Sequence, residues 1–358
     1  MALKRFTAQR FRCLADISIE PDPEYTLIYG ANASGKTSLL EAVAYLGRGK
    51  SFRGAPPTSL IQHGEQEFVL YGQLEARGRA ASIGVRNSRS GLEVRVDGDS
   101  SGGTASLAAA LPLQVIDPDV HNLVSGGPDD RRRFVDWLAF HVEPDYLALW
   151  RQFRRALKQR NAALKAGTGR EPLIAWDKEF SNLGERLSAA RDRALGTALD
   201  TLREHGGALL KADIDFRYTQ GWGADKSLQE ALEEHVERDL VAGTTQVGPH
   251  RADVRLIVDE RQARRLVSRG QQKLLASAMI LAATETVQSA LERPLLLLLD
   301  DPAAELDQDS ITRLMERVAS LGCQVIATSL RRDELVFPVP PRVFHVEQGR
   351  LQQVASGG

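Results

Sequence analysis

The sequence predicts an α/β fold in which a mixed, largely parallel sheet is interrupted by an inserted, mainly helical arm. Short apolar segments at residues 25–29, 295–299 and 325–327 are separated by helix-like segments, which is the pattern of buried parallel strands. Between about 128 and 240 the chain instead shows apolar residues at helical spacing. We therefore expect a discontinuous sheet domain from residues 1–125 and 243–358, with an arm domain at residues 126–242.

The expected elements follow in order along the chain. Alternating or short apolar runs predict strands at residues 17–19, 25–29, several within 65–105, 254–258, 295–299, 325–327 and, as the last element, 342–346. Apolar residues at helical spacing predict helices at residues 39–46, 150–164, about 175–205 and about 269–291. A linker at residues 166–169 separates two of these helices, and Ser227 with Glu230 is typical of a capping box that opens another.

Composition narrows the class of protein. The 358 residues carry 46 basic and 47 acidic side chains, so any basic surface must be a local patch. The two cysteines, Cys13 and Cys323, exclude a disulfide framework and fit a reducing compartment. No apolar run is long enough to span a bilayer, and the first residues lack the apolar core of a signal peptide. We expect a soluble, cytoplasmic protein with no membrane partner.

A phosphate-binding loop lies between the first buried strand and the helix that follows it. Residues 30–37 read GANASGKT, which fits the motif G-x-x-x-x-G-K-[ST] in its required strand–loop–helix context. Backbone N–H groups of such a loop and the start of the helix bind phosphate oxygens. We expect ATP there, with Lys36 at the β- and γ-phosphates and the Thr37 hydroxyl on Mg²⁺. The expected nucleotide-binding residues are Gly30, Ala31, Asn32, Ala33, Ser34, Gly35, Lys36, Thr37 and Ser38.

A second part of the site is expected where the apolar strand at residues 295–299 ends in two acids. Asp300 is placed to hold Mg²⁺, directly or through water, as the acid at the tip of a Walker B strand does. Asp301 is placed to act as general base on the attacking water. Lys36 and Asp301 are therefore the candidate catalytic residues, and Thr37 and Asp300 the candidate metal ligands.

The segment Ser268-Arg269-Gly270-Gln271 opens a predicted helix and resembles the ABC-type signature L-S-x-G-Q. In ABC-type ATPases this motif faces the γ-phosphate held by the other subunit, so ATP joins two chains. The motif is short, but it lies about 32 residues ahead of the Walker B acid Asp300, and this spacing strengthens the assignment. The sequence thus indicates a P-loop ABC-type ATPase head that closes as an ATP-dependent homodimer.

Several further motifs resemble those of the RecF family of bacterial recombination mediators, whose heads are similar to those of SMC and Rad50 proteins. The resemblance covers nearly the whole chain. Its landmarks are Phe11-Arg12, residues 30–38, 51–53, 131–137, Phe140-His141, 158–164, 176–179, 248–250, 268–271 and 300–307. It implies an ATP-dependent dimer that binds duplex or gapped DNA and, with RecR and RecO, promotes loading of RecA. It also implies slow, DNA-stimulated ATP hydrolysis, a role in gap repair, fork maintenance and SOS induction, and a cytoplasmic, nucleoid-associated location.

The resemblance also implies roles for single residues. Gln114 is a candidate Q-loop residue, although a lone Gln before a strand is as often plain polar surface. Asp307 matches the D-loop, with Ala304 where the family commonly has Ser. Thr328 stands where transporter ATPases have a switch His, and it either bonds the γ-phosphate or simply ends a strand. Arg12 either contacts the nucleotide or is a surface arginine.

DNA contacts are expected on a basic stripe. From residue 151 to 170 the chain has seven basic side chains and no acidic side chain until Glu171, and such a stripe suits sequence-independent phosphate contacts. The candidate residues are Arg151, Arg154, Arg155 and Lys158. A solvated helix face, or pairing with an acidic helix, would produce the same pattern. Arg131–Arg133, for which a structural role fits equally well, and Lys50 with Arg53 are further candidates.

Two other functions share most of these residues. A transporter ATPase subunit would need a membrane partner and usually a switch His, and Thr328 stands in its place. A nucleotide-gated scaffold would bind ATP without useful hydrolysis and would differ only in whether Asp301 acts.

Overall fold

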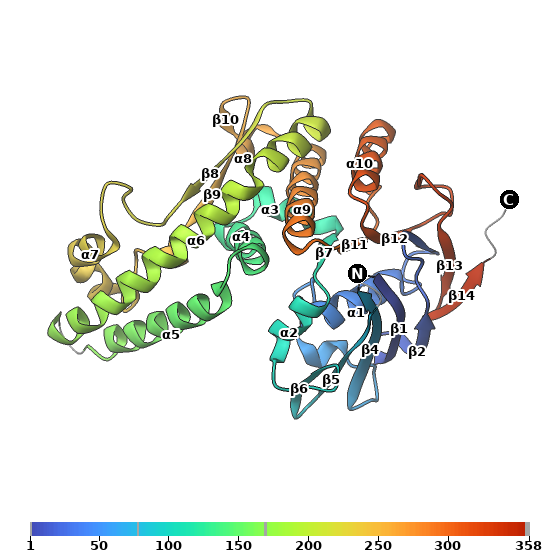
Figure 1. The fold of residues 1–358 in the computed structure, drawn as a ribbon, viewed down its shortest axis with the longest axis horizontal. Helices are drawn as coiled ribbons and strands as arrows, with labels where there is room; N and C mark the ends of the chain where they lie inside the picture. The colour runs from blue at the N-terminus through green and yellow to red at the C-terminus, as the bar shows by residue number, and fades with distance from the viewer. Residues whose placement is uncertain (1, 77–78, 168–169, 355–358) are drawn as a thin grey trace. The chain divides into compact units, whose positions relative to one another are not determined.

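The computed structural model describes residues 2–76, 79–167 and 170–354. The chain forms two compact units, one from residues 1–120 with 277–358 and one from residues 121–276. Each unit has its own β-strands and its own buried apolar residues (Figure 1).

The first unit contains a six-stranded sheet in the order β14-β13-β3-β12-β11-β7. Its strands are β3 (Tyr25–Tyr29), β7 (Leu113–Ile116), β11 (Leu296–Leu299), β12 (Gln324–Ser329), β13 (Arg342–Glu347) and β14 (Arg350–Val354). Every neighbouring pair is parallel except β13 with β14. All four residues of β11 are buried, as expected for a central parallel strand with both faces covered. The carboxyl ends of β3, β11 and β12 therefore meet at one edge of the sheet.

A second, antiparallel sheet in this unit has the order β2-β1-β4-β5-β6. Its strands are β1 (Ala2–Phe11), β2 (Leu14–Ile19), β4 (Glu67–Ala76), β5 (Arg79–Ser88) and β6 (Gly91–Val96). Helix α1 (Lys36–Arg48) contacts strands of both sheets, so one apolar core joins them. The rings of Phe11 and Tyr45 both meet Phe68 edge to face within this core, at 5.0 and 5.2 Å. The unit is completed by η1 (Pro57–Leu60), α2 (Gly103–Ala110), most of η2 (Pro118–His121) and α10 (Gln308–Ser320).

The second unit is mainly helical. Its helices are α3 (Asn122–Ser125), α4 (Pro128–Val142), α5 (Tyr146–Lys165), α6 (Arg170–Leu210), α7 (Leu228–Ala242), η3 (Pro249–Arg251) and α8 (Ala263–Leu266). A small antiparallel sheet, β10-β9-β8, joins β8 (Ile214–Thr219), β9 (Asp253–Val258) and β10 (Arg261–Gln262). Helix α6 packs against α4, α5 and α7 and gives the unit its length (Figure 1). Helix α9 (Arg269–Leu291) begins in this unit and ends in the other.

Most expected elements are present, but the prediction missed others, among them strands β8 and β14 and helices α2 and α10. The predicted strand at 25–29 and the predicted helix at 269–291 match β3 and α9, and Ser227 with Glu230 forms the expected capping box. Residues 342–346 were wrongly expected to be the last element, because β14 follows as the antiparallel edge strand. The helical block also contains β8, which pairs with β9. The second compact unit also includes residues 243–276, which we expected in the head.

The arm assignment for residues 126–242 stays a prediction.

Among the described residues, one helix, α9, is long and apolar enough to cross a membrane, and 72% of its apolar window is buried inside the protein. Such burial is what the core helix of a folded domain shows.

Candidate nucleotide site

The predicted phosphate loop connects β3 to α1 and has the backbone that such a loop needs. Ala33 and Gly35 adopt left-handed conformations, with φ of 61° and 115°. A Cβ atom on Gly30 would lie 2.3 Å from the Val346 carbonyl oxygen, so only glycine fits at that position. The loop thus leads from the carboxyl edge of the parallel sheet directly into the start of α1.

Lys36 folds over this loop. Its Nζ donates hydrogen bonds to the carbonyl oxygens of Gly30 at 2.6 Å and Ala31 at 2.9 Å. Burial lowers the pKa of Lys36, while the negative charges of Asp301 and Asp300 act in the opposite direction. The ammonium group therefore lies within electrostatic reach of both acids that follow β11.

Asp300 accepts hydrogen bonds from two predicted site residues. Its Oδ1 receives the hydroxyl of Thr37 at 3.0 Å and that of Thr328 at 2.9 Å. The Thr328 oxygen also accepts the backbone N–H of Asp301 at 3.0 Å. Burial raises the pKa of Asp300, and the two hydroxyl donors oppose that shift. The structure thus brings Thr37, Asp300 and Thr328 together and gives Thr328 a role in positioning both acids.

The oxygen donors fit Mg²⁺ as part of a larger coordination shell. Thr37 and Asp300 supply one hydroxyl and one carboxylate, which are hard oxygen ligands. Within the described ranges there is no group of three or more His, Cys, Asp or Glu side chains that could hold a metal ion by itself. Mg²⁺ commonly binds through one or two protein oxygens together with phosphate oxygens, so this donor set suits a nucleotide-bound ion.

Arg12 lies in the tight turn between β1 and β2 and pairs with Glu41 of α1. Its Nη2 donates to Glu41 Oε1 at 2.9 Å, and its Nε contacts the other carboxylate oxygen. The adjacent Cys13 Sγ lies 3.5 Å from the Ser38 hydroxyl, which puts this turn beside the start of α1. Arg12 is therefore an ion-paired residue next to the start of α1, and the interpretation as a plain surface arginine does not hold.

Gln114 is not brought to the other site residues. It is buried in β7 opposite Leu297, and its Oε1 accepts a hydrogen bond from Arg48 at 3.0 Å. Arg48 ends α1, whereas the phosphate loop lies at the other end of that helix. The Q-loop role of Gln114 remains a prediction that this contact does not favour.

Asp117 is an acid near the site that the sequence reasoning missed. It directly follows β7, and burial, with Asp119 and Asp300 next in effect, raises its pKa to about 6. The backbone N–H of Asp300 bonds to Ile116 O at 2.8 Å, so the ends of β7 and β11 are adjacent. The available signal was an acid directly after a short apolar strand, the same pattern that identified Asp300.

The two motifs that are predicted to act at a dimer interface, the D-loop residue Asp307 and the signature segment, each lie at the start of a helix. Asp307 caps α10 by accepting the Ser310 N–H at 2.7 Å. Ser268 and Gln271 bond reciprocally at the start of α9, where Ser268 N–H donates to Gln271 Oε1 at 2.9 Å. Ser268, Arg269 and Gln271 are exposed and Gly270 is half-buried. The signature segment belongs to the second compact unit and the phosphate loop to the first.

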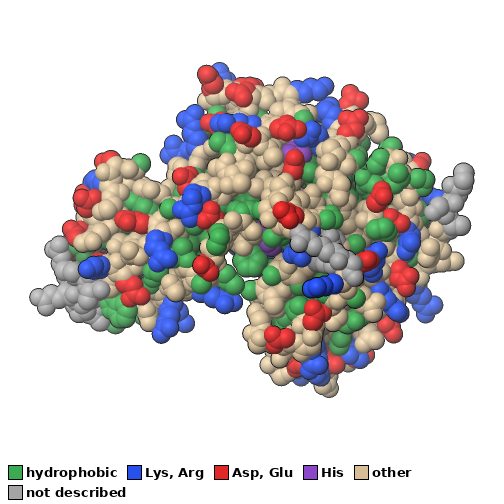
Figure 2. All heavy atoms as spheres, in the orientation of Figure 1, with side chains coloured by type: hydrophobic (Ala, Val, Ile, Leu, Met, Phe, Trp, Pro, Cys, Tyr) green, Lys and Arg blue, Asp and Glu red, His purple; other side chains and the backbone are tan. Residues whose placement is uncertain are grey.

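The predicted basic stripe is an exposed face of α5. Arg151, Arg154, Arg155 and Lys158 are all exposed, and none of them forms an ion pair with an acid in the described part of the chain. The Arg154 guanidinium lies 4.9 Å from the centre of the Trp150 ring. Elsewhere basic and acidic side chains are mixed over the visible face (Figure 2). The alternative of pairing with an acidic helix therefore has no support among the described residues.

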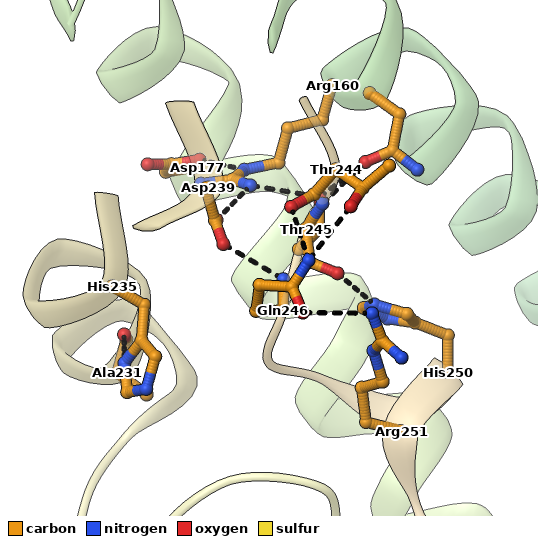
Figure 3. A network of polar contacts seen from close by, with 11 residues as sticks. Arg160, Asp177, Ala231, His235, Asp239, Thr244, Thr245, Gln246, His250 and Arg251 are labelled. Carbon is orange, nitrogen blue, oxygen red and sulfur yellow. Dashed lines mark hydrogen bonds and ion pairs between the residues drawn. The ribbon is translucent and has the colours of Figure 1, made fainter. Parts of the chain in front are cut away.

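Arg160 belongs to the same basic run but is fully buried. Figure 3 shows its polar contacts. Its guanidinium bonds to Asp177 and Asp239, each at 2.7 Å, and to the Thr245 hydroxyl at 2.9 Å. These contacts join α5 to α6, to α7 and to the segment after α7. Arg160 therefore holds the tip of the helical unit together and is not part of the exposed stripe.

The second DNA candidate, Arg131–Arg133, is at least partly structural. Arg131 is buried and pairs with Asp253 of β9 at 2.7 Å. Arg132 donates to the Ala252 carbonyl, and Arg133 pairs with Asp130. Arg131 and Arg132 thus tie α4 to β9 and the residue before it.

The parallel sheet, the phosphate loop at its edge and the acids after β11 are those of a P-loop ATPase head of the ABC type. A family model described as the RecF/RecN/SMC N-terminal domain matches residues 2–350. The DNA replication and repair protein RecF of Shewanella pealeana is 37% identical over 357 residues, covering 98% of this chain and 99% of that protein. The same protein of Pseudomonas fluorescens is 38% identical over 362 residues, covering 99% and 98%. The chain belongs to the RecF family, as its motifs indicated.

Solved structures agree with this assignment. One of the recombination mediator protein RecF with ATP in the RecFOR pathway has a TM-score of 0.89 at 24% identity and covers 99% of this chain and 98% of that chain. An Smc head bound to the C-winged helix domain of ScpA has a TM-score of 0.61 at 14% identity, covering 99% and 97%. These likenesses show the fold. Family membership favours a function in DNA replication and repair over a transporter ATPase subunit.

Proposed function

We propose that this chain is an ATP-dependent DNA-binding recombination mediator. Two chains would close around two ATP molecules with Mg²⁺. Each ATP site would be formed by both chains. One chain would contribute residues 30–37 and Asp300, and the other would contribute Ser268–Gln271. The observation that carries the proposal is the convergence of Lys36, Thr37, Asp300 and Thr328 at one sheet edge in a full-length member of the RecF family.

Each residue has a chemical role in this proposal. The loop N–H groups and Lys36 bind phosphate oxygens, and Thr37 with Asp300 holds the ion. Asp301, positioned by Thr328, accepts a proton from the attacking water. Because ATP gates a clamp here, hydrolysis is expected to be slow and DNA-stimulated.

The DNA contact is assigned to Arg151, Arg154, Arg155 and Lys158 of α5. Exposed basic side chains without acidic partners suit phosphates, and the absence of a base-reading motif suits recognition of DNA structure over sequence. The RecFOR pathway named for the solved relative supports RecR and RecO as partners. Loading of RecA as the outcome is what the resemblance to the RecF family implies. Such a protein acts in the cytoplasm, at the nucleoid.

The test is fluorescence anisotropy of labelled duplex DNA with and without Mg-ATP, at two salt concentrations. We expect binding that requires ATP and weakens with salt. Lys36→Ala should abolish both nucleotide binding and the ATP-dependent DNA binding, because it removes the only side-chain cation of the loop. ATP-dependent binding that persists in Lys36→Ala would contradict the proposal.

A further inference from the structure

A fully buried carboxylate lies beside the phosphate loop and has no part in the chemistry proposed above. Glu41 sits on α1 four residues after Thr37, and its side chain is 0% exposed. Its helix neighbours Leu39, Leu40, Ala42 and Val43 are apolar and buried. An ionised carboxylate in such a place costs several kcal/mol unless it is paired and hydrogen-bonded.

Glu41 is paired with two segments that are distant in sequence. The first is the β1–β2 turn, where Arg12 donates a hydrogen bond to Glu41 Oε1 and forms an ion pair with Oε2. Arg12 has a left-handed backbone, with φ of 52°, and its N–H is bonded to Leu60 O at 2.8 Å. The turn is therefore fixed at both its backbone and its side chain.

The second segment is the loop that follows α1. The Ser51 hydroxyl donates to Glu41 Oε1, and the same oxygen of Ser51 accepts the N–H groups of Arg53 at 3.0 Å and Ala55 at 3.3 Å. The conformation of this loop is thus attached to α1 through Glu41.

Both segments carry a basic residue, and the turn with Arg12 lies at the border of the phosphate loop. A Cβ atom on Gly35 of the phosphate loop would lie 3.2 Å from the sulfur of Cys13, the neighbour of Arg12. The Arg53 N–H is bonded at 3.0 Å to the hydroxyl oxygen of Ser51, which is itself bonded to Glu41. The turn that carries Arg12 therefore lies beside the phosphate loop, and the loop that carries Arg53 is attached to the same helix, α1.

We propose that Glu41 is a positioning residue that holds Arg12 and the loop carrying Arg53 in place for the phosphates of a bound nucleoside triphosphate. The inference deepens the proposed function and rests on it. A purely stabilising role would not require this arrangement, since well-packed apolar residues often replace buried ion pairs without loss of stability. The pair instead fixes two cations whose separate segments would otherwise move independently of α1.

The experiment measures the Kd for Mg-ATP, and the melting temperature without nucleotide, in a double-mutant cycle of Glu41→Gln and Arg12→Gln. Glu41→Gln keeps the shape and an acceptor for Ser51 but removes the charge. Each single substitution should weaken Mg-ATP binding about tenfold, and the double variant should be no weaker than either, because both break the same pair. Ser51→Ala, which leaves the ion pair intact and releases the loop, should also weaken binding and serves if Glu41→Gln does not fold.

The matched control is Gln324→Leu. Gln324 is another buried polar residue of this unit, and its amide joins β12 to the backbone of Leu3 and Asp22. This variant should lower the melting temperature and leave the Kd for Mg-ATP unchanged. Two results would overturn this inference and leave the proposed function intact. One is a wild-type Kd for Mg-ATP in Glu41→Gln, and the other is additive effects of Glu41→Gln and Arg12→Gln on that Kd. A wild-type protein that does not bind Mg-ATP would overturn the proposed function as well.

Discussion

Asp300 and Asp301 are neighbours in the chain but have different surroundings. Asp300 is buried and accepts hydrogen bonds from two hydroxyl groups, so the position of its Oδ1 atom is fixed. Asp301 is partly exposed in a left-handed conformation, with φ of 48°, and its backbone is fixed by Thr328. The fixed carboxylate of Asp300 suits a metal ligand, and the solvent-accessible carboxylate of Asp301 suits proton transfer with water.

At this scale we expect Asp301→Asn to separate ATP binding from hydrolysis. The amide has the same shape but cannot accept the proton, so turnover should fall by about 100-fold or more while the Kd for Mg-ATP stays within a few-fold. Single-turnover hydrolysis and equilibrium binding measure the two quantities. Unchanged turnover in Asp301→Asn would remove Asp301 from the general-base role.

Buried polar contacts join the elements of the helical unit. One of these contacts, made by His250, makes the stability of the protein depend on pH. Burial lowers the pKa of His250 to about 4, although its ring bonds to the Thr245 carbonyl at 2.9 Å. Arg251 and Arg132 lower this pKa further, and Asp239 opposes them. Figure 3 shows the contact of this ring with Thr245. The ring is therefore neutral in the folded protein at neutral pH.

Because the unfolded chain binds this proton near pH 6.5 and the folded chain only near pH 4, acid favours unfolding. Stability should fall as the pH decreases from about 6.5 to 4, by at most about 3 kcal/mol from this group. His250→Gln, whose amide can still donate to the carbonyl, should show a flatter decline. Thermal melts of both proteins between pH 7 and pH 5 make the comparison, and parallel curves would show that His250 does not titrate there.

The basic face of α5 gives a second prediction at the scale of an element. Replacing Arg151, Arg155 and Lys158 by Gln should weaken DNA binding and reduce the slope of log K against log salt by about 0.9 for each lost phosphate contact. The control is Arg193→Gln on α6, an exposed arginine that is paired with Glu143. An unchanged salt slope in the triple variant would place the DNA elsewhere.

The same scale shows what could be predicted from the sequence. β3, β11 and α9 carry unbroken local patterns, and their predicted limits are within one residue of the observed ones. β8 has only six residues within a helical block, and its partner β9 lies far along the chain. The predicted site residues Lys36, Thr37 and Asp300 come together because parallel strands end at one edge. The burial of Glu41 and Arg160 depends on partners from distant turns and helices, which no local pattern reveals.

At the scale of the whole molecule, the proposed site is shared between two chains. The phosphate loop and the signature segment lie in different compact units of one chain, and Ser268, Arg269 and Gln271 are exposed at the start of α9. A closed twofold dimer would contain two identical composite sites. A defect in either half of the site should then be complemented by a chain that carries the other half intact.

Mixing Lys36→Ala with Ser268→Arg tests this claim most directly. Each variant alone should be inactive in ATP hydrolysis, because two identical variant chains cannot form a complete site. A mixed dimer has one intact site, so the mixture should recover hydrolysis, at about a quarter of the wild-type rate if half of the dimers are mixed. A mixture no more active than its components, in a wild-type protein that hydrolyses ATP, would contradict the shared site.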